Sequence, residues 1–104
     1  MNVTIRRYES TDQARTSELV KKVEETLVPQ LSELPGFSGY YLIDSGNGVM
    51  TSVGFFDTAA HGDESNRFAS TWVREQKLEG ALPNPPKTTI GEVVVQKTRE
   101  LVGA

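Results

Sequence analysis

The chain has 104 residues, no cysteine and a formal net charge of −3. This size favours one domain with a single core, residues 1–104, and the absence of cysteine excludes disulfides and thiolate chemistry. There is no basic patch for a nucleic acid, no apolar run near the ~20 residues that span a bilayer, and no apolar core of a signal peptide, so we expect a cytoplasmic protein without nucleic-acid or membrane partners.

A strand is predicted over residues 2–8, with its side chains alternating between two faces. One face carries Val3, Ile5 and Arg7, and the other carries Thr4, Arg6 and Tyr8. The two adjacent arginines therefore put one charge on each face. Either both extend to the surface, or one of them points into a cavity and holds an anionic or carbonyl group.

A first helix is predicted over residues 12–34. Ser10, Thr11 and Asp12 are suitable N-caps, and the apolar side chains that follow recur every three or four residues. Pro29 removes a backbone donor inside this pattern, which predicts a kink near Glu25 or Thr26. Pro35-Gly36 is expected to end the helix.

Two strands over residues 37–44 and 49–56 are predicted to form a hairpin around Asn47-Gly48, since both residues accept the positive φ of a type I′ turn. A simple two-residue turn would place Leu42 opposite Val53, and each internal glycine opposite an aromatic ring. One face would then carry Tyr40, Leu42, Val53 and Phe55, and the other Phe37, Tyr41, Ile43, Met50 and Phe56. Both faces are apolar, which predicts that both are covered.

A second helix is predicted over residues 58–79, capped by Asp57-Thr58 or starting firmly only at Asp63 because Gly62 weakens the first turn. Its apolar stripe consists of Phe68, Ala69, Trp72 and Val73, and Gly80 is a plausible end. The prolines of residues 81–89 favour an extended connector. A last strand is predicted over residues 90–97, with Val93 to Val95 at its centre.

The order strand, helix, strand, strand, helix, strand is that of a ferredoxin-like α+β fold, with both helices on one face of a four-stranded antiparallel sheet. The helices leave the other face bare although it is apolar. We therefore predict a homodimer through the sheet face, because a two-fold axis lets the same patch serve both subunits.

Four segments carry a resemblance to a known group of proteins. VTIRRYES, ELPGFSGYYLIDSGNGVMTSVGFFD, SNRFASTWVREQ and LPNPPKTTIGEVVV, which cover most of the chain, resemble small uncharacterised bacterial proteins of the dimeric α+β barrel superfamily, near the antibiotic-biosynthesis-monooxygenase domain. The resemblance implies a homodimer whose two sheets close a barrel. It also implies a pocket in each subunit between the sheet and the helices.

Relatives in this superfamily include haem-degrading enzymes and cofactor-free oxygenases of polycyclic aromatics. The haem-degrading relatives use a histidine after a tryptophan on the second helix and an asparagine near the first strand. Here His61 precedes Trp72, and Asn2 lies at the extreme terminus, so the sequence departs from that pattern. The cofactor-free oxygenases hold a carbonyl-bearing substrate with asparagine, tryptophan and arginine, which Asn66, Trp72 and Arg74 could supply.

The predicted ligand-binding side chains come from the first strand, the hairpin and the second helix: Arg6, Arg7, Tyr40, Tyr41, Asn66 and Trp72. The pocket is expected to be lined by Trp72, by either Tyr40 or Tyr41, and by either Arg6 or Arg7. We expect no metal and no cofactor, since the one histidine has no nearby carboxylate in the sequence. Two hypotheses remain: a cofactor-independent monooxygenase-like enzyme on a small aromatic or carbonyl compound, and a non-catalytic domain for ligand binding or assembly.

Overall fold

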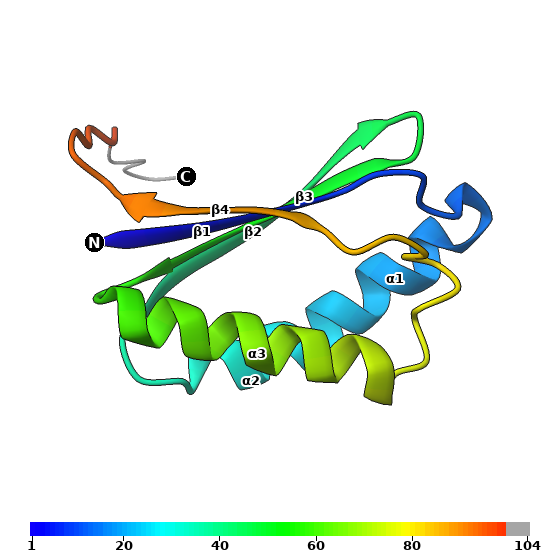
Figure 1. Ribbon diagram of the computed structural model, residues 1–104, viewed down its shortest axis with the longest axis horizontal. Helices are drawn as coiled ribbons and strands as arrows, with labels where there is room; N and C mark the ends of the chain where they lie inside the picture. Colours follow the sequence, from blue (N-terminus) through cyan, green and yellow to red (C-terminus); the bar gives the residue numbers. More distant parts are fainter. Residues whose placement is uncertain (100–104) are drawn as a thin grey trace.

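The computed structural model describes residues 1–99 as two layers, a four-stranded antiparallel sheet and a layer of helices on one of its faces (Figure 1). The strands are β1 (Asn2–Tyr8), β2 (Phe37–Gly46), β3 (Val49–Phe56) and β4 (Lys87–Glu92), in the order β2-β3-β1-β4. The helical elements are a 3₁₀ turn (Gln13–Arg15), α1 (Thr16–Lys22), a π-helical segment (Val23–Leu27), α2 (Val28–Ser32) and α3 (Ala59–Glu75). The predicted ferredoxin-like fold is confirmed.

The first helical region is continuous but changes its hydrogen bonding in the middle. The amide of Val28 donates to the carbonyl of Val23, five residues back, and this bond closes the π-helical segment. Pro29 follows directly and has no amide hydrogen for the ordinary helical bond. The irregularity predicted near Glu25 or Thr26 therefore takes the form of a π segment.

The hairpin turns at Asn47-Gly48 as predicted, with φ values of 54° and 76°. A β-bulge between Asp44 and Gly46 then shifts the register by one residue. Tyr40 pairs with Gly54 and Tyr41 pairs with Val53, so the predicted pairs are wrong by one position.

Because of the bulge, the side chains on each face of the sheet differ from the predicted groups. Tyr40 and Leu42 lie on the helix-covered face, because they are paired with Gly54 and Ser52 of β3. The opposite, open face carries the following residues of β1, β2 and β3: Val3, Ile5, Tyr41, Ile43, Val53 and Phe55. Tyr40 and Phe55 therefore do not share a face, contrary to the prediction.

The last strand lies earlier in the chain than predicted. β4 pairs with β1 from Lys87 opposite Arg7 to Glu92 opposite Asn2. The amide of Val93 still donates to the carbonyl of Met1 at 2.9 Å, just past Asn2 and Glu92, which are the last pair in the register of β1 and β4. The ladder therefore ends, and Val94 and Val95 remain 87% and 86% exposed instead of forming the centre of a strand.

α3 begins at Ala59, because the Thr58 hydroxyl accepts a hydrogen bond from the amide of His61 at 3.2 Å. The alternative start at Asp63 is wrong, and so is the predicted end at Gly80. Lys77 adopts a φ of +56°, its amide donates to the carbonyl of Arg74, and the amide of Leu78 donates to the carbonyl of Val73. These two bonds form a Schellman motif, which ends the helix with a lysine where glycine is usual.

The core lies between the helices and the covered face of the sheet. Its buried side chains come from both layers and from the segment after α3: Tyr8, Leu19, Val23, Leu27, Leu31, Met50, Trp72, Leu78 and Leu82. Among residues 1–99, no helix is long and apolar enough to cross a membrane.

The end of α3 makes a testable prediction about stability. Lys77 is exposed and has a left-handed conformation that costs an L-residue roughly 1 kcal/mol, so Lys77→Gly should raise the free energy of unfolding by about 0.5–1 kcal/mol. Lys77→Ala is the matched control and should bring no such gain. Urea denaturation measures both; equal stabilities of the two variants would contradict the observed helix end.

Candidate functional site

Two adjoining cavities lie between the sheet and the helices, each with a volume of about 30 Å³. We call them the Trp72 cavity and the Asn66 cavity, after a residue of α3 that lines each. Both are lined by the same five residues of β1, β2, β3, the π segment and α3: Arg6, Tyr40, Ser52, Leu27 and Ala69. The alternation of β1 and the bulge in β2 thus bring a cation and a phenol to the junction of the two cavities.

Among residues 1–99, Arg6 is the one charged side chain that lines the two cavities, and it is only 8% exposed. Its Nη2 donates to the Tyr8 hydroxyl at 2.6 Å, and its guanidinium carbon lies 5.5 Å from the centre of the Tyr8 ring. Within residues 1–99 it forms no ion pair with a carboxylate, whereas the neighbouring Arg7 contacts Glu9 at 3.5 Å. A buried cation is costly unless a partner compensates its charge, so Arg6 is suited to an anionic or strongly polarised ligand atom.

Two tyrosines flank this guanidinium on the covered face. Burial raises the pKa of Tyr40 to about 12, although the positive charge of Arg6 acts in the opposite direction. Burial likewise raises the pKa of Tyr8, against the influence of Arg6. Both phenols therefore keep their protons at neutral pH, and neither is a ready base.

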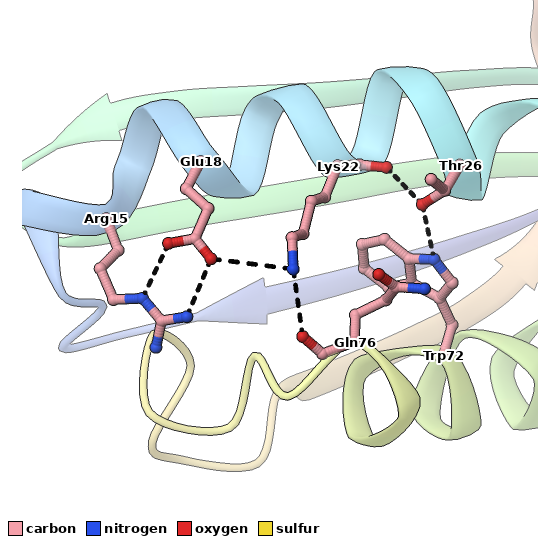
Figure 2. Close-up of polar contacts among 6 residues, drawn as sticks. All are labelled: Arg15, Glu18, Lys22, Thr26, Trp72 and Gln76. Carbon is pink, nitrogen blue, oxygen red and sulfur yellow. Dashed lines mark hydrogen bonds and ion pairs between the residues drawn. The ribbon is translucent and has the colours of Figure 1, made fainter.

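Trp72 is held by a chain of polar contacts that links α3 to the first helical region (Figure 2). Its Nε1 donates to the Thr26 hydroxyl at 3.0 Å, which in turn donates to the carbonyl of Lys22 at 2.6 Å. The Lys22 ammonium donates to the carbonyl of Gln76, just past the end of α3, at 3.3 Å. The π segment supplies Thr26, so this irregular stretch orients the indole that lines the cavity.

Asn66 lies one cavity away from Trp72, in accordance with their spacing of six residues on α3. Its Oδ1 is buried and has no hydrogen-bond partner among the described residues, and the same holds for Oγ1 of Thr4 in the same cavity. Four of the six predicted residues, Arg6, Tyr40, Asn66 and Trp72, thus line the two cavities. The other two, Arg7 and Tyr41, lie on the open face of the sheet.

His61 lies at the start of α3 and lines neither cavity. Its Nδ1 lies 2.5 Å from Oδ1 of Asp57, and this contact lowers the pKa of the Asp57 carboxyl. The statement that the histidine has no carboxylate nearby is therefore wrong; the four-residue spacing between Asp57 and His61 was the available signal. No group of three or more possible metal ligands occurs within residues 1–99.

Sequence reasoning did not select Thr4, Tyr8 or Ser52 as site residues, although all three line the cavities. The alternation of β1 already placed Thr4 and Tyr8 on the face of Arg6, and this was the usable signal. Ser52 became recognisable only with the register of the hairpin, which pairs it with both Leu42 and Arg6.

The raised pKa of Tyr40 predicts a loss of stability at high pH. In the unfolded chain this phenol ionises near its ordinary value of 10.0, but in the folded protein only near 12. The stabilising effect is complete below about pH 10 and is lost as the pH rises through this window, because the unfolded state then binds fewer protons. Between these two pH values, the free energy of unfolding of the wild type should fall by on the order of 1–3 kcal/mol relative to that of Tyr40→Phe. Urea denaturation at several pH values measures this difference. If the free energies of unfolding of the wild type and Tyr40→Phe changed equally with pH, the prediction would be contradicted.

Comparisons with protein-family models and with curated proteins find no match. Solved structures do match. A protein of unknown function from Nitrosomonas europaea has 15% identity and a TM-score of 0.74, over 95% of this chain and 94% of that chain. A monooxygenase from Streptomyces coelicolor, in complex with the ligand nanaomycin D, has 17% identity and a TM-score of 0.72, over 95% and 92%.

A third structure comes from Bordetella bronchiseptica, and its name places that protein with the antibiotic biosynthesis monooxygenases. It has 18% identity and a TM-score of 0.72, over 90% of this chain and 97% of that one. These identities are low, so the likeness is one of fold. The chain therefore shares the ferredoxin-like fold of these solved structures.

Proposed function

We propose that the two cavities bind a small aromatic or carbonyl compound through Arg6 and that the protein acts on it as a cofactor-independent monooxygenase. The observation that carries this proposal is the buried guanidinium of Arg6, which has no carboxylate partner among the described residues and lines both cavities. Trp72 and Tyr40 supply flat apolar surface beside it. The fold is shared with the monooxygenase from Streptomyces coelicolor in complex with nanaomycin D, which agrees with this assignment.

The chemistry would be the oxidation of a phenol to a quinone. One atom of O₂ becomes the new carbonyl oxygen on the ring, the other leaves as water with the two displaced hydrogens, and the substrate itself supplies all four electrons. A guanidinium beside the phenol oxygen favours the phenolate, the more easily oxidised form. The role of Arg6 would be to stabilise that anion.

The size of the cavities limits the compound to a small one. A benzene ring occupies a cavity of about 150 Å³ in an engineered core, so a ring needs the lining to move apart. The π segment contributes Val23 and Leu27 to this lining, and such segments are frequent at functional sites. The small volume of the cavities favours a single ring over a polycyclic compound.

A specific observation also supports non-catalytic ligand binding. The described part of the chain, residues 1–99, contributes no histidine, aspartate or glutamate to the lining, and both tyrosines keep their protons at neutral pH. The site therefore offers no ordinary general base. An enzyme here would need a substrate that ionises in water, whereas a binding protein would need no base at all.

The variant Arg6→Met tests the proposed function. In the presence of a panel of single-ring phenols, the wild type should consume O₂ and form quinone. In Arg6→Met the rate of O₂ consumption should be at least tenfold lower, because the phenolate loses its cation. Arg7→Met is the matched control, since Arg7 is the adjacent arginine on the opposite face. An oxygen electrode measures uptake, and the absorbance of quinones measures product.

Binding is followed in the same samples through Trp72, the one tryptophan of the chain. Ligand binding that depends on Arg6 but brings no oxygen uptake would identify the non-catalytic alternative. If none of the phenols changes the fluorescence of Trp72 or the uptake of O₂ in the wild type, both readings of the cavity fail.

We further propose that the open face of the sheet forms a homodimer interface. Tyr41 and Ile43 on this face are 63% and 46% exposed, and Val94 and Val95 beyond β4 are largely exposed. Burial of such side chains contributes about 25 cal/mol per Å², and a second copy offers a matching surface. The helices cover one face of the sheet, and a second copy of the chain would cover the other (Figure 1).

The variant Phe55→Glu tests this interface. In sedimentation equilibrium at micromolar concentration, the wild type should show twice the chain mass of 11.4 kDa, and Phe55→Glu should show the single-chain mass. The reason is the cost of burying a carboxylate in an apolar interface. Ser70→Glu, at an exposed position of α3, is the control and should remain dimeric. A single-chain mass for the wild type would contradict the dimer.

A further inference from the structure

The Asn66 cavity contains two buried oxygen atoms that make no hydrogen bond within residues 1–99, Oγ1 of Thr4 and Oδ1 of Asn66. Thr4 is only 4% exposed, so water outside the protein does not satisfy its hydroxyl. A buried polar atom without a partner costs free energy, and such atoms are rare in folded proteins. Two of them in the lining of one cavity indicate a position for a polar group of a ligand.

The neighbouring side chains leave this position open. Ser65 also lines the cavity, but its hydroxyl already donates to the carbonyl of Gly62 at 2.6 Å. Gly62 packs so closely that a Cβ there would lie 3.2 Å from Oγ1 of Thr4, and 3.0 Å from Oδ1 of Asn2. The glycine thus lets α3 approach β1 without filling the space beside the Thr4 hydroxyl.

From these observations we infer that Thr4 and Asn66 form a hydroxyl-binding subsite of the cavity. A hydroxyl group suits both partners, because it can donate to Oδ1 of Asn66 and accept from the hydroxyl of Thr4. An ether or a methyl group could not donate to the amide oxygen. The subsite assigns to Thr4, which no prediction from the sequence included, a direct contact with the ligand.

The position of Thr4 relative to Arg6 defines the class of compound. The two residues are separated by one position on β1 and face the same cavity, so their Cα atoms lie roughly 7 Å apart. Arg6 lines both cavities and Thr4 lines only the Asn66 cavity, so a compound that contacts both residues needs two separate polar groups. The ligand class is therefore a single-ring compound with an anionic or carbonyl oxygen at Arg6 and a hydroxyl at Thr4 and Asn66, which rests on the proposed role of Arg6.

Two probes of nearly equal shape test the subsite, 4-hydroxybenzoate and 4-methylbenzoate. Both carry the carboxylate for Arg6, and only the first carries the hydroxyl. Isothermal titration calorimetry should show that the wild type binds 4-hydroxybenzoate at least about tenfold more tightly than 4-methylbenzoate. Thr4→Val should abolish this preference and leave the affinity for 4-methylbenzoate unchanged, while Thr4→Ser, which keeps the hydroxyl, should restore it.

The outcomes separate this inference from the proposed function. Equal affinities of the wild type for the two probes, both lost in Arg6→Met, would overturn the subsite and leave the role of Arg6 intact. The same holds if Thr4→Val, folded by circular dichroism, keeps the full preference, since a group other than Thr4 would then recognise the hydroxyl. No binding of either probe to the wild type would overturn the subsite together with the Arg6 site.

Discussion

The bulge between Asp44 and Gly46 determines what each face of the sheet carries. One extra residue in β2 places Tyr40 beside the buried guanidinium of Arg6, and Tyr41 on the open face beside Phe55. Without the bulge, the same residues would exchange faces, because side chains alternate with a period of two. The cavity and the apolar outer surface therefore depend on one irregular position next to a regular turn.

The second constraint is the cost of a buried charge. Arg6 lies in an apolar layer, and its one hydrogen-bond partner among the described residues is the Tyr8 hydroxyl; such an arrangement reduces stability unless something compensates the charge. Active and binding sites often retain this kind of cost, because a site that is satisfied by its own protein has little affinity for a ligand. The oxygens of Thr4 and Asn66 are likewise buried polar atoms without a partner among the described residues. They can accept hydrogen bonds from a ligand, whereas the Arg6 guanidinium can only donate them.

The helical layer contributes through an irregularity of its own. Pro29 interrupts the regular hydrogen bonding, and the π segment before it places the Thr26 hydroxyl within 3.0 Å of the indole nitrogen of Trp72. Lys22 joins the same stretch to the end of α3 (Figure 2). The indole nitrogen is thus held by Thr26, which lines neither cavity, while Trp72 itself lines one of them.

The sequence by itself determined the order of the elements, the turn at Asn47-Gly48 and the irregularity before Pro29, because these depend on local backbone preferences and periodicity. It also placed Thr4 and Arg6 on one face of β1. Only the tertiary structure decided that this face is the covered one, that a bulge shifts β2 by one residue, and that β4 ends at Glu92. Each of these depends on pairing between strands that lie far apart in the chain, such as the register that pairs Glu92 of β4 with Asn2 of β1, and no local pattern records such pairing.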